Sequence, residues 1–283
     1  MSTQNSTPDV GRIGAWRGRG VTPEFVAAVE QLGYPAVWIG GSPAGDLVAI
    51  ERLLDATSTI RVATGIVNIW QSDPAVTAAA YHRVWARHPG RLLIGIGAGH
   101  REATAEFTQP YEALAEFLDV LDANGVPVEH RALAALGPKV LKLSADRTAG
   151  AHPYLVSPEH TRRAREILGT GPLLAPEQKV VLAADRAQAR AIGGETVDRY
   201  LGLQNYVANL RRLGFTDEDF ADGGSDRLFD ALIVHGDAAA IAAGVRAHLD
   251  AGADHVAVQV ISDGDQIPVF EELAREFAPE LGR

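Results

Sequence analysis

Short apolar runs alternate along this chain with segments that have the spacing of amphipathic helices. Five of these runs end in glycine or polar residues and lead into a helix-like stretch: residues 36–39, 61–66, 91–97, 179–184 and 255–261. A repeated strand, turn and helix is the pattern of a parallel sheet whose strands are joined by helical crossovers. The pattern therefore predicts an α/β barrel.

Three further runs, residues 12–16, 131–136 and 151–156, complete a set of eight expected strands. With 283 residues the chain is close to the ordinary size of a (β/α)8 TIM barrel, about 250 residues. We therefore expect one barrel domain over residues 1–283. Residues 185–230 are longer and more helical than one crossover requires, so we expect an insertion between strands seven and eight that lies over the active-site face. Residues 1–10, rich in Ser, Thr and Asn, are expected to be disordered.

Composition and charge exclude several classes of function. The net charge of −10 and the dispersed basic residues argue against a nucleic-acid partner. The absence of cysteine excludes disulfides, thiolate metal sites and a cysteine nucleophile, and no HExxH-like cluster suggests a metal site. No apolar run reaches the length of about 18 residues needed to span a membrane, and the amino terminus has no signal-peptide pattern. We expect a cytoplasmic protein that acts on a small molecule.

The residues that follow the expected strands are small or expose their backbone. Ligands of such barrels bind at the carboxyl ends of the strands, so these residues are expected to line the site. Loops of this kind suit a flat aromatic cofactor, because side-chain bulk would prevent stacking and main-chain N–H groups can bond a ring edge.

The segment 95–100 (GIGAGH) invites comparison with the dinucleotide-binding fingerprint. His100 stands where the last glycine is required, no helix follows at once, and the expected acidic residue about 20 positions later is missing. We therefore set that interpretation aside.

Seven segments together resemble the luciferase-like flavin and deazaflavin oxidoreductases, and within them the branch of probable coenzyme F420-dependent oxidoreductases of actinobacteria. They are residues 33–40 (GYPAVWIG), 63–66 (ATGI), 73–76 (DPAV), 91–99 (RLLIGIGAG), 136–139 (LGPK), 151–160 (AHPYLVSPEH) and 251–256 (AGADHV). They follow the family's order over nearly the whole chain. The resemblance implies a barrel that binds F420 or, alternatively, FMN and moves a hydride to or from an organic substrate.

Members of this family carry a non-prolyl cis peptide at the end of the third strand, which maps here to Gly65 and Ile66. The alternative is an ordinary bulge in a core strand. From this resemblance and from positions after the expected strands, we expect the cofactor to be bound by Gly65, Ile66, Asn68, Gly97, Ala98, Gly99, Leu136, Gly137, Pro138, His152, Tyr154, Val156, Ser157, His160 and Thr161. For Asn68, His152 and Tyr154 the alternative is a place in the wall of the site.

Two of these assignments have their own chemistry. The helix that begins at Ser157 offers free N–H groups to a cofactor phosphate, with the turn at Gly137 beside it and Arg227 or Lys139 as possible counter-charges; a plain N-cap is the alternative for Ser157. His100 stands where relatives that oxidise glucose 6-phosphate have a glutamate, so we expect it to be the catalytic proton-transfer group, or else a solvated loop residue.

Other functions stay open at this point. An FMN-dependent monooxygenase can use the same scaffold, and so can a non-catalytic cofactor-binding protein. A hydrolase or aldolase would require a catalytic lysine or a pair of carboxylates at the carboxyl ends of strands, and Lys139, Lys142 and Lys179 are expected elsewhere. Alanine-rich helices around residues 75–80 and 238–243 are compatible with a homodimer.

Overall fold

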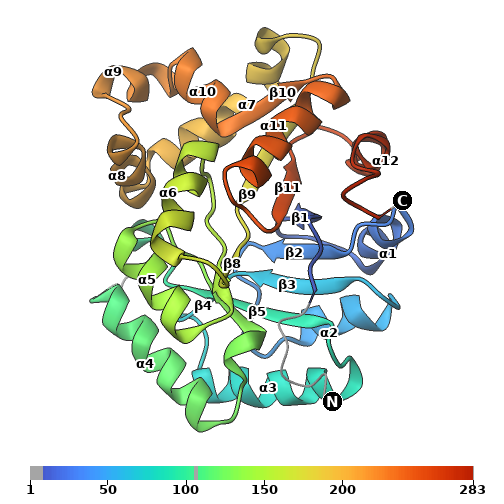
Figure 1. Ribbon diagram of the computed structural model, residues 1–283, viewed down its shortest axis with the longest axis vertical. Coiled ribbons are helices and arrows are strands. Elements are labelled where there is room, and N and C mark those ends of the chain that lie inside the picture. Colours follow the sequence, from blue (N-terminus) through green and yellow to red (C-terminus); the bar gives the residue numbers. More distant parts are fainter. Residues whose placement is uncertain (1–8, 105–107, 283) are drawn as a thin grey trace.

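The computed structural model describes residues 9–104 and 108–282, and its strands run parallel in one curled sheet (Figure 1). The strands are β1 (Ile13–Arg17), β2 (Ala36–Gly40), β3 (Arg61–Gly65), β4 (Val67–Asn68), β5 (Leu92–Gly97), β6 (Arg131–Leu133), β7 (Gly150–Ala151), β8 (Leu173–Leu174), β9 (Glu177–Leu182), β10 (Ile233–Gly236) and β11 (Val256–Val260). Every strand is preceded or followed by helical segments, as the alternation of apolar runs predicted.

The sheet closes because one continuous segment has neighbours on both sides. Strand β8 pairs with β7, and β9, three residues further along the chain, pairs with β11. Strand β11 in turn pairs with β1, with Ile13 opposite Val256. The ring therefore contains the eight strand positions of a (β/α)8 barrel, which confirms the predicted fold class.

The helices lie outside the strands, and several begin at the residues that the sequence indicated. They are α1 (Pro23–Gln31), α2 (Val48–Asp55), α3 (Pro74–Arg87), α4 (Pro110–Ala123), α5 (Pro138–Arg147), α6 (Pro158–Leu168), α7 (Arg186–Leu201), α8 (Gln204–Arg212), α9 (Asp217–Phe220), α10 (Asp226–Leu232), α11 (Ala238–Asp250) and α12 (Ile267–Glu276). Thr22 and Asp73 accept hydrogen bonds from first-turn N–H groups of α1 and α3. Ser157 precedes α6 but makes no capping hydrogen bond with its side chain.

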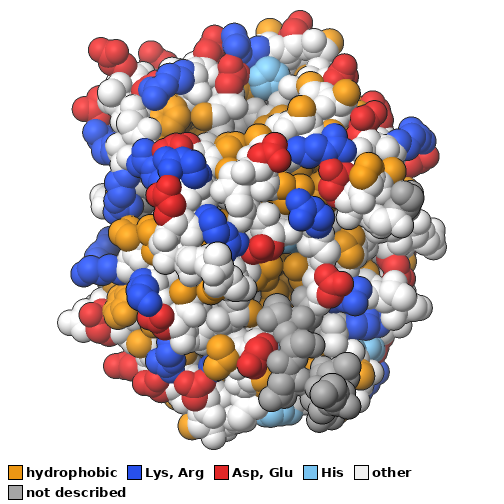
Figure 2. All heavy atoms as spheres, in the orientation of Figure 1, with side chains coloured by type: hydrophobic (Ala, Val, Ile, Leu, Met, Phe, Trp, Pro, Cys, Tyr) orange, Lys and Arg blue, Asp and Glu red, His pale blue; other side chains and the backbone are white. Residues whose placement is uncertain are grey.

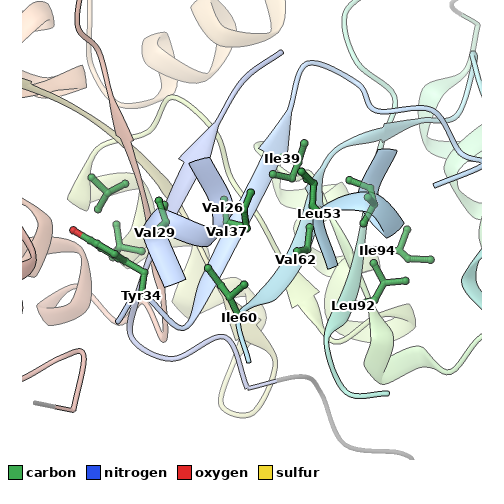
Figure 3. Packing of buried hydrophobic residues seen from close by; sticks show 14 of the residues in the cluster. Val26, Val29, Tyr34, Val37, Ile39, Leu53, Ile60, Val62, Leu92 and Ile94 are labelled. Atoms are coloured by element: carbon green, nitrogen blue, oxygen red, sulfur yellow. The ribbon is translucent and has the colours of Figure 1, made fainter. Parts of the chain in front are cut away.

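The main core lies between the strands and the surrounding helices. Val37 and Val62 on neighbouring strands face Val26 of α1 and Leu53 of α2, and all four are almost fully buried (Figure 3). The period of two along the strands and the 3.6-residue period along the helices bring these apolar faces together. The opposite faces of the strands are left for the interior of the barrel, where the polar side chains gather.

The insertion between strands seven and eight has a hydrophobic core of its own. Helices α7 to α10 pack around Val197, Leu210 and Phe229, and they lie in the upper part of the view in Figure 1. The sequence analysis gave no strand in this region, but Ile233–Gly236 pairs with β9 as β10. The apolar stretch before Gly236 is short and directly continues α10, so its spacing alone does not distinguish strand from helix.

Several expected boundaries differ from the structure. The sixth expected strand, residues 151–156, is reduced to β7, and residues 152–156 form a loop at the mouth of the barrel. The seventh begins earlier than residue 179, because residues 173–177 already pair with their neighbours. Of the segment 1–10 expected to lack order, residues 1–8 lie outside the described residues, whereas Val10 is buried in the core. No helix of the described residues is both long and apolar enough to span a membrane.

Candidate functional site at the mouth of the barrel

An aromatic stack fills the interior of the barrel below its mouth. The ring of Trp38 lies flat on that of His152, with centroids 3.9 Å apart and an interplanar angle of 13°. Trp38 Nε1–H donates to His255 Nε2 at 3.0 Å, and His255 Nδ1 bonds the carbonyl of Gly11 at 2.8 Å. Burial lowers the pKa of His255 to about 4 and that of His152 to about 3, so both rings are neutral near pH 7.

Two buried ring nitrogens face the same glycine. A Cβ atom on Gly65 would lie 3.2 Å from both Trp16 Nε1 and His152 Nε2. Within the described part of the chain, neither nitrogen has a hydrogen-bond partner. His152 Nδ1 bonds the carbonyl of Ala175 at 2.6 Å and therefore carries the proton, which leaves Nε2 as an acceptor. The Trp16 Nε1–H donor and the His152 Nε2 acceptor thus lie side by side next to Gly65, which has no side chain.

The register of the strands produces this arrangement. Trp16 lies opposite Trp38 on β2, and Gly40 at the end of β2 lies opposite Gly65 on β3. The indole of Trp16 lies so close to Gly40 that a Cβ there would come within 2.0 Å of it. Glycine at position 40 therefore allows the indole of Trp16 to lie across the strand ends beside Gly65.

The residues expected after the third and fourth strands are brought together. The Gly65-Ile66 peptide bond is cis, as the resemblance implied. A Cβ on Gly97 would lie 2.9 Å from Cγ1 of Ile66, and one on Gly99 would lie 2.6 Å from the side-chain Nδ2 of Asn68. Trp70 Nε1–H donates to the carbonyl of Ala98 at 2.8 Å, which ties the two loops together.

A buried ion pair lies beneath a group of tyrosines. Lys179 Nζ lies 3.0 Å from Glu177 Oε2, and both side chains are fully buried. The same ammonium lies 3.7 Å from the ring centre of Tyr154, and the Tyr154 hydroxyl bonds Tyr200 at 2.8 Å and Gln259 at 2.9 Å. Burial raises the pKa of Glu177 and lowers that of Lys179.

Sequence reasoning missed this pair. Lys179 was expected at the start of a strand, away from the mouth, whereas the strand begins several residues earlier and its ammonium reaches the ring of Tyr154. The signal in the sequence was the polar run Glu177, Gln178 and Lys179 inside an apolar strand. Such a run points to a barrel interior that contains charge.

His100 lies under the insertion. Its Nδ1 lies 3.3 Å from Asn205 Oδ1, and its ring centre lies 5.3 Å from that of Tyr206, both on α8. The backbone N–H of Gln204 donates to Glu102 at 3.1 Å in the same contact. Burial lowers the pKa of His100, so the neutral ring donates from Nδ1 to Asn205 and keeps Nε2 as an acceptor.

A second polar group gathers where α5 and α6 begin. His160 Nε2 bonds the carbonyl of Leu136 at 3.0 Å, while His160 Nδ1 is buried without a hydrogen-bond partner among the described residues. Arg212 of α8 reaches to 3.9 Å from the position of a Cβ on Gly137. Arg163 donates to the carbonyl of Arg212 at 2.7 Å. Two guanidinium groups thus lie near the amino termini of two helices.

The remaining expected residues of this region have other surroundings. Thr161 Oγ1 bonds His248 Nδ1 at 2.8 Å in the packing of α6 against α11. Val156 is fully buried. Arg227 pairs with Asp219 within the insertion, and Lys139 lines a separate cavity with Pro138 and Tyr111. Arg212, which the sequence did not single out, is instead a cation that lies near Gly137.

The mouth is narrower than the open slot that the glycine-rich strand ends predicted. Tyr154, Tyr200 and Tyr206 pack against one another there, with ring centroids 5.2–6.2 Å apart. A cavity of ≈ 250 Å³ remains beside them at the ends of β1 and β11. Sites for larger organic ligands measure about 300–1,000 Å³, so this cavity by itself is smaller than a tricyclic cofactor requires. Among the described residues, no group of three or more His, Asp or Glu side chains is placed to hold a metal ion.

Comparison with known proteins connects this geometry to a family. The model of the luciferase-like monooxygenase family matches residues 10–201. An F420-dependent secondary alcohol dehydrogenase in complex with an F420-acetone adduct has a similar fold, with a TM-score of 0.73, 14% sequence identity and coverage of 96% of this chain and 99% of that chain. The coenzyme F420-dependent tetrahydromethanopterin reductase of Methanopyrus kandleri has a TM-score of 0.72 and 16% sequence identity, with coverage of 96% of this chain and 99% of that chain. The FMN complex of the oxygenating constituent of 3,6-diketocamphane monooxygenase from Pseudomonas putida has a TM-score of 0.65 and 16% sequence identity, with coverage of 94% of this chain and 96% of that chain.

Proposed function

The chain belongs to the luciferase-like monooxygenase family, and from this premise we propose that it is an F420-dependent oxidoreductase that transfers a hydride between the deazaflavin and a small organic substrate. Two solved structures of similar fold are named for their dependence on F420, and a third contains FMN. The choice of F420 over FMN is part of the proposal. When bound, the deazaflavin supplies the hydride chemistry, and the protein supplies binding, orientation and proton transfer.

The pair of unpartnered ring nitrogens at Gly65 is the observation that carries the proposal. Trp16 Nε1 offers a hydrogen and His152 Nε2 offers a lone pair. Buried polar groups are costly when they lack partners, by about 1–3 kcal/mol each, so this pair is better satisfied by a ligand. The edge of a deazaflavin pyrimidine ring carries both an N–H and carbonyl oxygens, which complement this donor and acceptor.

The amino termini of α5 and α6 fit the phosphate of the cofactor side chain. The backbone N–H groups of a first helical turn attract anions, and Ser157 is not committed to capping α6. Arg212 adds a cation near Gly137, and Arg163 supports it through the carbonyl of Arg212. We assign Gly137, Ser157 and Arg212 to this end of the cofactor.

His100 is assigned to proton transfer at a substrate oxygen. Its lowered pKa keeps it neutral near pH 7, so its Nε2 can accept a proton when an alcohol is oxidised. The contact with Asn205 fixes the tautomer and the ring plane. The adjoining Tyr206 helps to exclude water from the mouth, where a hydride must not meet solvent.

A parallel titration of the purified protein with F420 and with FMN, followed by fluorescence quenching, tests the proposal. We expect F420 to bind more tightly than FMN and to be reduced when alcohols are added without oxygen. Binding of FMN alone, with oxygen consumption on reduction, would contradict hydride transfer to F420 and indicate a monooxygenase. Binding of neither cofactor would indicate a protein that keeps only the scaffold.

A further inference from the structure

The cavity at the ends of β1 and β11 has a polar lining that the cofactor assignment does not use. Its volume is ≈ 250 Å³, and its lining includes Trp16, Arg17, Arg19, Gln259, Ser262 and Gln266. Because sites for larger organic ligands start at about 300 Å³, this cavity fits only a small molecule. The residues come from two neighbouring strands, β1 and β11, and from the segments that follow them, so the pairing of these strands brings the lining together.

Two guanidinium groups give the cavity a positive charge. Arg17 lies over the ring of Phe25, 5.2 Å from its centre, and Arg19 Nε donates to the carbonyl of Gly41 at 3.0 Å. Each contact holds the side chain while other N–H groups of the guanidinium remain available. In the part of the chain that the structure describes, neither arginine forms an ion pair with a carboxylate, although Asp and Glu outnumber Lys and Arg by 36 to 26.

Buried polar atoms in the same lining add hydrogen-bonding capacity. Gln266 Nε2 donates to the carbonyl of Val260 at 2.9 Å, whereas Gln266 Oε1 is buried without a partner among the described residues. This oxygen is an acceptor and calls for a ligand that carries a hydroxyl or N–H group. Ser262 Oγ accepts a hydrogen bond from Gly264 N, so its own hydrogen is available to an oxyanion.

The cavity adjoins the proposed reaction site through two shared residues. Trp16 lines the cavity and also directs Nε1 towards Gly65. Gln259 lines it and accepts the hydrogen bond of Tyr154, which covers Lys179. The far end of a ligand bound by the two arginines would therefore lie near Trp16 and Gly65, where the edge of the cofactor is proposed to bind.

From these observations we propose that the cavity binds the oxyanion of a small hydroxylated organic acid, a carboxylate or a phosphate monoester, and that this acid is the substrate class of the enzyme. Arg17 and Arg19 bind the anion, and Gln266 accepts a hydrogen bond from the ligand. The substrate role rests on the proposed function, whereas binding of the anion does not. Charge-assisted bonds of this kind are shorter and about twice as strong as neutral ones.

The test uses the indole N–H signals of the 15N-labelled protein, which contains four tryptophans. The Trp16 signal is assigned with Trp16→Phe, and the protein is titrated without cofactor with lactate and with glycerol 3-phosphate. Propane-1,2-diol and glycerol serve as the neutral counterparts. We expect one or both anions to shift the Trp16 signal in a saturable way and the neutral compounds to leave it unchanged. The more tightly bound anion identifies the carboxylate or the phosphate.

Variants separate the site from a general charge effect. Arg17→Gln and Arg19→Gln are expected to weaken binding of the anion by about tenfold to a hundredfold each. Arg52→Gln, an exposed position on α2, removes the same charge and is expected to have no effect. Equal weakening in all three variants, or equal shifts with acids and neutral compounds, would overturn the proposal. If the anions bind and F420 does not, the cavity assignment stands and the proposed function fails.

Discussion

The indole of Trp38 stacks on the imidazole of His152 at 3.9 Å, and this contact fixes the direction of His152 Nε2 towards Gly65. The Trp38 ring is itself held by the hydrogen bond from its Nε1–H to His255. The floor of the mouth is therefore set by three rings from three different strands and loops. Figure 2 shows that charged side chains of both signs are scattered over one face of the molecule, in contrast to these three uncharged rings in the interior.

Replacing Gly65 with alanine is expected to weaken cofactor binding. The new methyl group would lie 3.2 Å from both Trp16 Nε1 and His152 Nε2 and would occupy the space that the ligand edge requires. We expect at least a tenfold rise in the Kd for F420, measured by fluorescence titration. Gly194→Ala on α7, where a Cβ meets nothing within 4 Å, is the matched control. An unchanged Kd for F420 in Gly65→Ala would show that the cofactor does not bind beside Gly65, Trp16 and His152.

Arg212 is expected to distinguish phosphorylated from unphosphorylated cofactors. Its guanidinium lies near Gly137, at the end assigned to the phosphate. Arg212→Ala should raise the Kd of F420 and of FMN by about tenfold and leave that of riboflavin unchanged, because riboflavin has no phosphate. Arg199→Ala, an exposed change on α7, serves as the control for lost charge. A similar loss for riboflavin would show that Arg212 acts through the packing of α8.

The pair formed by Glu177 and Lys179 predicts a large cost for removing one partner. Lys179→Met leaves the Glu177 carboxylate buried without its cation, which is expected to lower the free energy of unfolding by about 3–5 kcal/mol. The double variant Lys179→Met with Glu177→Gln should recover most of this loss, since Gln still accepts from the N–H of Leu155. Urea unfolding measures both. Equal losses in the two variants would show that packing, not charge, dominates.

Buried neutral histidines predict that the protein loses stability in mild acid. The pKa is lowered to about 3 in His152 and His248 and to about 4 in His255, each by burial, from an ordinary value near 6.5. Below pH 6.5 these histidines therefore bind protons in the unfolded chain but stay neutral in the folded chain. Their stabilising contribution is complete above pH 6.5 and is lost as the pH falls towards about 4 for His255 and about 3 for His152 and His248, at about 1.4 kcal/mol per pH unit for each histidine.

Urea unfolding at several pH values between 7 and 4.5 measures this slope. His248 is bonded by Thr161 and by Gln178 at 2.7 Å, and His248→Gln keeps hydrogen-bonding groups while removing one titrating ring. We expect this variant to reduce the slope by about one third of the contribution of these three histidines. A variant with the slope of the wild type would mean that His248 takes up its proton without unfolding.

The sequence by itself determined the barrel and the kind of loop at its mouth. Alternation of apolar runs with helical spacing, N-caps such as Thr22 and Asp73, and glycines after the strands depend on neighbours within a few residues, so they can be read along the chain. The same local signals located Gly65 and Gly97 at strand ends, Gly137 before a helix, and the insertion after the seventh strand.

Only the tertiary structure decided which polar groups meet. Lys179 and Tyr154 come from different elements, as do Trp16 and His152, and their contact depends on the register of strands and on where the sheet closes. Tyr200 and Tyr206 of the insertion narrow the mouth because α7 and α8 pack against loops that follow much earlier strands. The N–H of Gln204 bonds Glu102, and the ring of Tyr200 contacts that of Tyr154. Hydrophobic periodicity specifies which face of an element is buried, but it carries no information on the distance between side chains of separate elements.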